Sequence, residues 1–258
     1  MTGPDPETAN TARVYDYLLG GAHNFAADRE AARRAVAATP ILPVAARANR
    51  AYLGRVVTWC LQQGVRQFLD LGSGVPTVGN VHEIAHRIDP ATRVAYVDVE
   101  PVAVAVADDL LRGLPTATVT RADLADPDAV LAAPGVADLL DFAQPVAVLA
   151  VAVLHFVPGD VGAVLAAYRR RLAPGSVVAI SHGSDDLDDP DLAAMLRAGA
   201  ESYRGSAMPV TYRSRAEIRG LLAGLDVVEP GLVDATNWPV ADPSAPPSAF
   251  YALVGQVR

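Results

Sequence analysis

Two glycines form a predicted tight turn, Gly72-Ser73-Gly74, which directly follows a strongly apolar segment. Glycines at such a turn let the backbone approach a ligand closely, and exposed amides at a strand end can bind a polar group. Asp98 ends the next apolar segment, where a carboxylate can accept hydrogen bonds from both ribose hydroxyls of an adenosine cofactor. Together, the turn and the acid predict a nucleoside-binding site.

A second acid, Asp123, ends the third apolar segment and precedes Leu124. Its short carboxylate can accept a hydrogen bond from an adenine amino group while a backbone amide meets a ring nitrogen. Each feature alone has a plainer interpretation: a tight turn, a cap for the helix after Pro101, or the start of a loop. Their occurrence at three consecutive strand ends favours cofactor binding.

The turn also discriminates between adenosine cofactors. A dinucleotide-binding loop has a third glycine where this sequence has Thr77, and that glycine permits close packing beneath a pyrophosphate. The replacement counts against NAD and FAD and favours S-adenosylmethionine, which has no phosphate. Two alternatives stay open: an NAD(P)-dependent oxidoreductase of the same fold, and an inactive module that binds S-adenosylmethionine.

The elements that position these residues alternate between strand and helix. Short apolar segments predict strands at 66–71, 93–98, 117–122, 146–154 and 176–181. Helical patterns separate these strands at 80–88, 102–112, 128–140 and 161–172. This order predicts an α/β fold with a parallel sheet and helices on both faces, in which the carboxyl ends of the strands share one edge.

The regions on either side of this core differ from it. Helices are predicted at 12–19, 26–38, 44–63 and near 192–203, and Ser214 with Glu217 forms a capping box that opens another helix. A proline-rich connection joins two closing strands, 225–233 and 249–257, so we expect them to pair antiparallel. We expect one domain over 1–258: a helical lid or buttress at 1–43, a cofactor-binding core at 44–182, and a substrate-side insertion with closing strands at 183–258.

Composition narrows the function classes. The net charge of −8 should repel nucleic-acid phosphates, and the absence of lysine excludes a P-loop and Schiff-base chemistry. Cys60 is the only cysteine, which excludes an internal disulfide and a cysteine-rich zinc site. His82 and Glu83 have no second ligand pair at metal spacing, so we expect no metal. With no signal peptide and no long apolar helix, we expect a cytoplasmic protein that binds no membrane.

Short segments spread over most of the chain match the motifs of a known protein family. They are RVYDYLLGG at 13–21, NF at 24–25, ADR at 27–29, ANRA at 48–51, QFLDLGSG at 67–74, PT at 76–77, GNVHE at 79–83, YVD at 96–98 and VLHF at 153–156. With these segments the chain resembles class I S-adenosylmethionine-dependent methyltransferases. More narrowly, it is similar to an actinobacterial family once catalogued as a domain of unknown function and now called S-adenosyl methyltransferase. The resemblance implies a Rossmann-like, seven-stranded sheet with an antiparallel C-terminal strand. It also implies a methyltransferase whose acceptor, undefined for the family, we expect to be a small molecule.

The expected cofactor site combines the residues above with positions from the same segments. It comprises Asp70, Gly72, Ser73, Gly74, Thr77, Asn80, Asp98, Val99, Asp123, Leu124, Ala150 and Val151. Val99 is included only as a backbone or flanking contact. Ala150 and Val151 are included as an apolar floor at the end of the fourth strand.

Three residues are candidates for handling the acceptor. His155 is the titratable group near the end of the fourth strand, and a neutral imidazole there could act as general base for a hydroxyl acceptor. Alternatively, His155 could stack near the adenine or cap the strand. Tyr17 and Asn24 lie where many small-molecule methyltransferases carry a lid, so we expect them to help shape the acceptor pocket.

Overall fold

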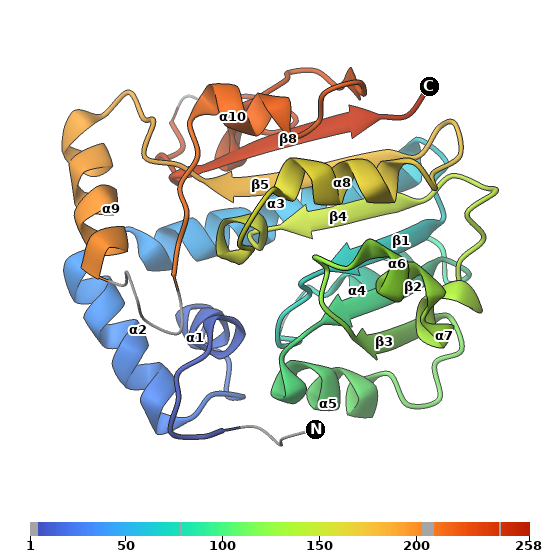
Figure 1. Ribbon diagram of the computed structural model, residues 1–258, viewed down its shortest axis with the longest axis horizontal. Coiled ribbons are helices and arrows are strands. Elements are labelled where there is room, and N and C mark those ends of the chain that lie inside the picture. The colour runs from blue at the N-terminus through green and yellow to red at the C-terminus, as the bar shows by residue number, and fades with distance from the viewer. Residues whose placement is uncertain (1–4, 78, 203–208, 243) are drawn as a thin grey trace.

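A twisted mixed sheet forms the centre of the computed structural model, which describes residues 5–77, 79–202, 209–242 and 244–258 (Figure 1). Its strands are β1 (Gln67–Leu71), β2 (Arg93–Asp98), β3 (Ala117–Arg121), β4 (Ala147–Val151), β5 (Val177–Gly183), β6 (Asp226–Val227), β7 (Val233–Asp234) and β8 (Phe250–Gln256). Their order is β3-β2-β1-β4-β5-β8-β6, and β7 also pairs with β8. The first five strands are parallel, and β8 is antiparallel to β5, β6 and β7.

The parallel strands form from short apolar segments that are buried on both faces. Every residue of β1 and of β5 is buried, as expected for strands covered on both sides by helices. The register places Leu71 opposite Val97 and Asp98 opposite Arg121, so β1, β2 and β3 end side by side. The edge that the sequence predicts for the site is therefore a single edge of the sheet.

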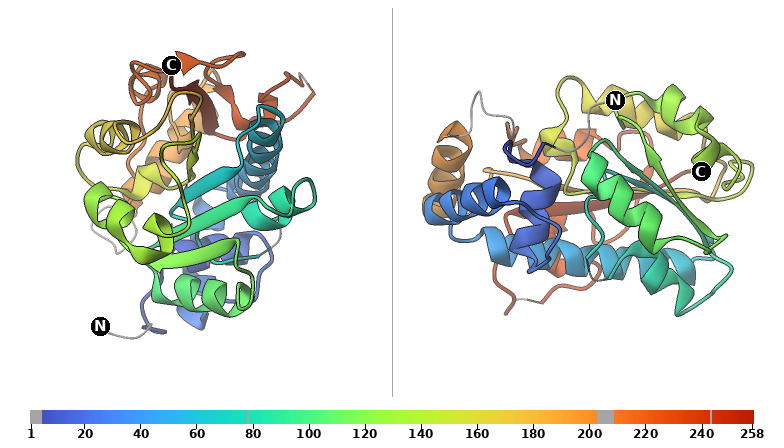
Figure 2. Two further views of the ribbon diagram at one scale, coloured as in Figure 1. Left: turned by 90° about the vertical axis from the view of Figure 1, so that its right-hand side faces the viewer. Right: turned by 90° about the horizontal axis from the view of Figure 1, so that it is seen from below.

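Helices cover both faces of this sheet, as the left-hand view of Figure 2 shows. One face is covered by α3 (Leu42–Gln62) and α4 (Val81–His86). The opposite face is covered by α6 (Pro127–Ala132), α7 (Pro134–Ala137), α8 (Val161–Arg169) and α10 (Arg215–Gly220). The remaining core helix, α5 (Pro101–Leu110), lies beside β3 (Figure 1), and a short 3₁₀ helix, η2 (Ala235–Asn237), follows β7.

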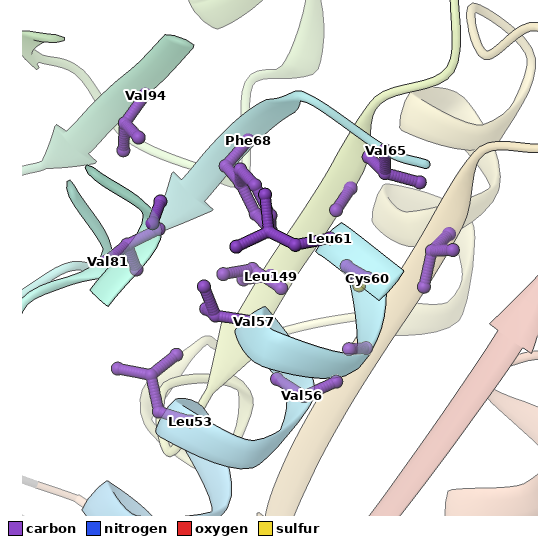
Figure 3. Packing of buried hydrophobic residues seen from close by; sticks show 14 of the residues in the cluster. Leu53, Val56, Val57, Cys60, Leu61, Val65, Phe68, Val81, Val94 and Leu149 are labelled. Atoms are coloured by element: carbon purple, nitrogen blue, oxygen red, sulfur yellow. The ribbon is translucent and has the colours of Figure 1, made fainter. Parts of the chain in front are cut away.

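The long helix α3 is fixed to the sheet by its apolar face. Figure 3 shows Val57 and Leu61 of α3 beside Phe68 and Leu149 of the sheet, and all four side chains are buried. Burying apolar side chains of this size stabilises the fold by roughly 1.5–3 kcal/mol each. The same packing sets the position of the first half of α3, which reaches past the carboxyl edge of the strands.

Three further helices lie beyond that edge: α1 (Thr11–Leu18), α2 (Ala26–Ala38) and α9 (Pro190–Ser202). Figure 1 and the right-hand view of Figure 2 both place α1 between α2 and the strand ends. The side chain of Asn10 caps α1 by accepting a hydrogen bond from the amide of Ala12. No helix within the described ranges is both long and apolar enough to cross a membrane.

The predicted α/β fold with a parallel sheet and an antiparallel C-terminal strand is confirmed, but three elements differ in extent. The predicted strand 146–154 ends at Val151, because Ala152 adopts a left-handed φ of +56° and the 3₁₀ helix η1 (Leu154–Phe156) follows. The predicted helix 128–140 is broken at Pro134, and the predicted strand 225–233 is interrupted around Pro230. That interruption leaves β6 and β7 as separate pieces, so eight strands replace the expected seven. Tyr203, the expected last residue of the helix 192–203, lies outside the described residues.

Candidate active site

A cavity of about 350 Å³, here called the cofactor cavity, opens at the carboxyl ends of β1, β2, β3 and β4. Nine of the twelve residues predicted for the cofactor site line it: Asp70, Gly72, Ser73, Gly74, Asp98, Val99, Asp123, Leu124 and Val151. They come from four different strand ends, which the parallel order brings to one place. The structure thus assembles most of the predicted set around one hollow large enough for a small organic ligand.

The other three predicted residues, Thr77, Asn80 and Ala150, do not line this cavity. Ala150 is fully buried inside the sheet, within the core that α8 covers. Asn80 is the N-cap of α4, and it borders a hollow of about 10 Å³ beside Asp70. The Oγ1 atom of Thr77 is buried and has no hydrogen-bond partner among the described residues. A cofactor role for these three residues stays a prediction.

The glycine turn has a backbone that suits glycine at both positions. Gly72 has φ +68° and Gly74 has φ +67°, a region that other residues adopt only at a cost. The amides of Gly72 and Ser73 both donate to the carbonyl of Val97, at 2.8 and 3.1 Å, which ties the turn to β2. A methyl group on Gly72 would overlap Cγ2 of Val153, whereas one on Gly74 would meet nothing within 4 Å.

Asp98 holds the turn in place while it borders the cofactor cavity. Its two carboxylate oxygens accept hydrogen bonds from the amides of Gly74, at 2.6 Å, and Glu100, at 2.8 Å. Burial raises the pKa of Asp98, and these two amides partly offset the effect. A carboxylate oxygen can accept more than one hydrogen bond, so each oxygen can still accept from a ligand hydroxyl.

Two groups of opposite charge lie at the end of the cavity near α3. Asp70 is buried, and burial raises its pKa to about 7; Arg50 lowers that pKa and Asp98 raises it further. Arg50, which the sequence analysis did not assign to the site, lines the same cavity, and its guanidinium lies 6.0 Å from the ring centre of Tyr15. In this position the carboxylate of Asp70 suits the ammonium of an amino acid, and the guanidinium of Arg50 suits its carboxylate.

Helix α1 forms a wall of the cofactor cavity through Asn10, Thr11, Ala12 and Tyr15. Its position is fixed by the Arg13 cluster, a buried set of ion pairs. The Arg13 guanidinium contacts Asp28 at 2.8 Å and Glu100 at 2.7 Å, and all three side chains are at most 7 % exposed. Because Glu100 follows Asp98 by two residues, this cluster joins the N-terminal helix to the loop that carries the predicted ribose acid.

A second cavity of about 150 Å³, here called the apolar cavity, adjoins the first. Thr11, Tyr15, Ala152 and Phe156 line both cavities. The apolar cavity extends between α1, α2, α3 and α9 toward the ends of β5 and β8. His155 lines the apolar cavity and is not among the lining residues of the cofactor cavity, so its ring lies on the side away from the predicted adenine site.

The residues at which the two cavities meet are held by a chain of hydrogen bonds. Tyr15 donates from its hydroxyl to the carbonyl of Ala46, at 3.0 Å, and accepts from the side-chain amide of Asn49, also at 3.0 Å. Asn49 in turn accepts a hydrogen bond from Ser181, whose hydroxyl oxygen accepts from the amide of Ala152 at 2.9 Å. The left-handed backbone at Ala152 is therefore fixed where the cavities meet.

The structure places the predicted acceptor residues Tyr17 and Asn24 outside both cavity walls. The amide of Asn24 donates to Asp16 at 2.8 Å and to the carbonyl of Gly21 at 2.9 Å, and its oxygen accepts from Arg29 at 3.2 Å. These contacts give Asn24 a structural reason to be polar. Tyr15, two residues before Tyr17, is the tyrosine of α1 that lines both cavities.

The fold and this site together define the class of protein. A parallel sheet closed by an antiparallel strand, with a glycine turn and acids on successive strand ends at one edge, is the arrangement that the resemblance to class I methyltransferases implies. Within the described ranges, no group of three or more His, Cys, Asp and Glu side chains is placed to hold a metal ion.

Comparison with known proteins identifies the family. The family model for S-adenosyl methyltransferases matches residues 3–256, and the chain belongs to that family. It is an S-adenosylmethionine-dependent methyltransferase, with S-adenosylmethionine as its cofactor. A search of curated proteins finds no match.

Solved structures agree with this assignment. A DUF574 family protein from Streptomyces avermitilis is 34 % identical, with a TM-score of 0.91 over 98 % of this chain and 99 % of that one. A candidate methyltransferase from Thermobifida fusca is 36 % identical, with a TM-score of 0.90 over 98 % and 96 %. The Burkholderia thailandensis 1,6-didemethyltoxoflavin-N1-methyltransferase, solved with bound 1,6-didemethyltoxoflavin and S-adenosylhomocysteine, is 18 % identical, with a TM-score of 0.51 over 81 % and 78 %. That third likeness shows the fold alone.

Proposed function

We propose that the protein transfers the methyl group of S-adenosylmethionine to a small molecule, with the donor in the cofactor cavity and the acceptor in the apolar cavity. The observation that carries this proposal is that the two cavities meet at Tyr15, Ala152 and Phe156. A methyl-transfer site needs two ligands whose reacting atoms are in contact. Two adjoining cavities with shared walls meet that requirement.

The residues of the cofactor cavity match the parts of the donor. Asp98 would accept from the ribose hydroxyls, and Asp123 with the amide of Leu124 would bind the adenine. Asp70 would bind the ammonium of the methionine part and Arg50 its carboxylate. When bound, the donor supplies an activated methyl group on its sulfonium, so the protein mainly has to position the acceptor and exclude water.

The N-terminal segment supports a small-molecule acceptor. Helix α1 covers the cofactor cavity and is held there by the Arg13 cluster, so a large acceptor would have to displace a buried ion-pair network. The net charge of −8 also disfavours nucleic acid. The run of arginines at 169–171 lies at the end of α8. Cations there interact favourably with the helix dipole, so a nucleic-acid site is not needed to explain them. We propose accordingly that the region 1–43 acts as a lid.

Calorimetric titration of the purified protein with S-adenosylmethionine, S-adenosylhomocysteine and NAD tests the donor site. We expect both sulfur compounds to bind with one site per chain and NAD to give no heat, because no third glycine makes room for a pyrophosphate. Tight NAD binding without binding of the sulfur compounds would overturn the proposal. If the donor binds but no acceptor is methylated in a screen with labelled donor, the alternative of an inactive binding module is favoured.

Donor binding should depend on pH through Asp70. Its pKa of about 7 in the empty protein means that Asp70 is largely neutral at pH 6 and ionised at pH 8. A cationic ligand favours the ionised form and lowers this pKa, so binding near pH 7 releases a proton and affinity rises with pH. We expect S-adenosylmethionine to bind severalfold more tightly at pH 8 than at pH 6, less than the roughly tenfold gain from Asp70 alone, because the donor's own α-ammonium begins to lose its proton near pH 8.

Titrations in two buffers of different ionisation enthalpy measure this proton release directly. The Asp70→Asn variant is the matched control, because it keeps the side-chain size and cannot ionise. Its affinity should be weaker than that of the parent at pH 8 and should not rise between pH 6 and pH 8. An affinity for the parent that does not change over this range, with no proton release, would contradict the role of Asp70.

A further inference from the structure

The walls of the apolar cavity restrict the charge of the acceptor. Among the residues that the structure describes, no Asp, Glu or Arg lines this cavity. Aliphatic side chains from α1, α3 and α9, such as Val14, Leu42 and Leu196, form much of the wall. Burying a carboxylate or an ammonium without a partner of opposite charge is strongly unfavourable. An acceptor that fits here is therefore uncharged.

The size of the cavity and its aromatic walls restrict the shape of the acceptor. A volume of about 150 Å³ is that of an apolar protein cavity which admits one benzene molecule. The rings of Tyr15, Phe156, Tyr212 and Phe250 line the space. Aromatic side chains pack favourably against another ring in offset or edge-on arrangements. A single aromatic ring is the ligand that these walls fit.

One polar side chain in the wall, His155, is left without a partner. It is 4 % exposed, and its Nδ1 has no hydrogen-bond partner in the part of the chain that the structure describes. The rings of Phe156 and Phe250 flank its imidazole, with centres 4.1 and 5.5 Å away. By contrast, His182 is fully paired, because its Nδ1 contacts the carbonyl of Gly183 and its Nε2 contacts Arg213, both at 2.7 Å.

The imidazole of His155 is uncharged at neutral pH. Burial lowers its pKa well below the ordinary value, and the neighbouring His182 and Arg213 lower it further. A neutral imidazole has one donor and one acceptor nitrogen, so it can accept a hydrogen bond from a hydroxyl. Since buried polar groups in native proteins almost always have partners, an unpaired imidazole in the wall of a cavity is a candidate to bind a ligand hydroxyl.

We propose that the methyl acceptor is an uncharged monocyclic aromatic alcohol, a compound of the phenol class, bound in the apolar cavity with its hydroxyl hydrogen-bonded to His155. This inference rests on the proposed function, which places the donor in the adjoining cavity. In the transfer, the phenol oxygen forms a bond to the methyl carbon as the carbon–sulfur bond breaks, and sulfur keeps the bonding electron pair. The hydroxyl proton is released to water, while the neutral imidazole of His155 orients the hydroxyl by hydrogen bonding.

Binding of three small probes tests the assignment: phenol, benzene and benzoate, each titrated into the protein alone and into the protein saturated with S-adenosylhomocysteine. We expect phenol to bind about tenfold more tightly than benzene, because of the additional hydrogen bond, and benzoate to give no detectable binding. The His155→Phe variant keeps a ring of similar size and removes both nitrogens. It should bind phenol and benzene equally, a change of preference that a purely structural role would not produce.

A pair of variants on α9 tests whether the probes enter the apolar cavity. Ala200 lines the cavity, whereas Ala198 on the same helix is exposed to solvent. Ala200→Phe should fill the space and abolish phenol binding. Ala198→Phe adds the same side chain outside the cavity and should leave phenol binding unchanged. Binding of S-adenosylhomocysteine by both variants shows that they are folded.

The possible outcomes separate this inference from the function on which it rests. If S-adenosylhomocysteine does not bind, the proposed function fails, and the titration of phenol into the protein alone still decides whether the cavity takes this ligand. If S-adenosylhomocysteine binds and phenol does not, only the acceptor assignment fails. Benzoate binding as tight as phenol binding, or equal phenol affinity in the two α9 variants, would also overturn it.

Discussion

Replacing Asp98 with alanine should weaken binding of S-adenosylmethionine by about a hundredfold or more. The carboxylate is the predicted partner of both ribose hydroxyls, and hydrogen bonds to a charged group contribute about 1.5–3 kcal/mol each. The loss also removes the two acceptors that hold the amides of Gly74 and Glu100, so the turn itself becomes less well positioned. Calorimetric titration at pH 7.5 measures the change.

Two further variants separate the ribose contacts from a general charge effect. Asp98→Asn keeps one carbonyl oxygen as an acceptor, so its affinity should lie between those of the parent and the alanine variant. Asp128→Ala removes an exposed carboxylate near the start of α6 and should bind like the parent. An alanine variant at 98 that binds the donor as tightly as the parent would remove the basis for the assigned cofactor site.

Replacing Gly72 with alanine should destabilise the fold by about 2–4 kcal/mol and lower the midpoint of thermal unfolding by roughly 5–15 °C. Two causes add. The φ of +68° disfavours any side chain, and the new methyl group would overlap Cγ2 of Val153 and lie 2.8 Å from its Cβ. Thermal unfolding followed by circular dichroism measures the effect.

The neighbouring glycine provides a matched control for the Gly72 prediction. Gly74 has nearly the same φ, but a methyl group there has nothing within 4 Å, so Gly74→Ala should destabilise by only about 1 kcal/mol. Adding Val153→Ala to Gly72→Ala removes the closest overlapping atom and should recover part of the lost stability. If the two glycine variants unfold at the same temperature, the close approach of Gly72 to Val153 contributes nothing.

The turn and the acids could be located from the sequence because their placement depends only on the order of the elements. Each follows a short apolar strand, and in a parallel sheet the carboxyl ends of consecutive strands meet at one edge. Asp98 and Asp123 could therefore be placed at the site without knowledge of side-chain packing. Ala150 does not line the cavity, because it precedes the end of β4 and lies within the sheet core; the strand register, which the sequence alone does not give, determines this position.

Arg50 and Tyr15 could not be placed in the same way. Arg50 reaches the cavity because α3 crosses the sheet at an angle set by packing with β1 and β4, and the helical pattern alone does not determine that angle. Residues two apart on a helix point in nearly opposite directions, so the choice between Tyr15 and Tyr17 depended on which face of α1 meets the strands. The Arg13 cluster, whose partners Asp28 and Glu100 are distant in the chain, decides that face.

The apolar cavity was inaccessible to sequence analysis for a related reason. Its walls join α1 and α2 from the beginning of the chain with α9 and Phe250 from near its end. Such contacts depend on tertiary packing rather than on any local pattern. The sequence identified His155 as the titratable group near β4. It did not show that the chain leaves the strand at Ala152, which is why His155 lines the apolar cavity.

Because α1 is a wall common to both ligand sites, occupation of one cannot be independent of the other. Thr11 and Tyr15 border donor and acceptor alike, and Arg13 ties their helix to the segment that bears Asp98. A ligand in one site that shifts α1 therefore changes the affinity of the other site, and thermodynamic reciprocity makes that change equal in both directions.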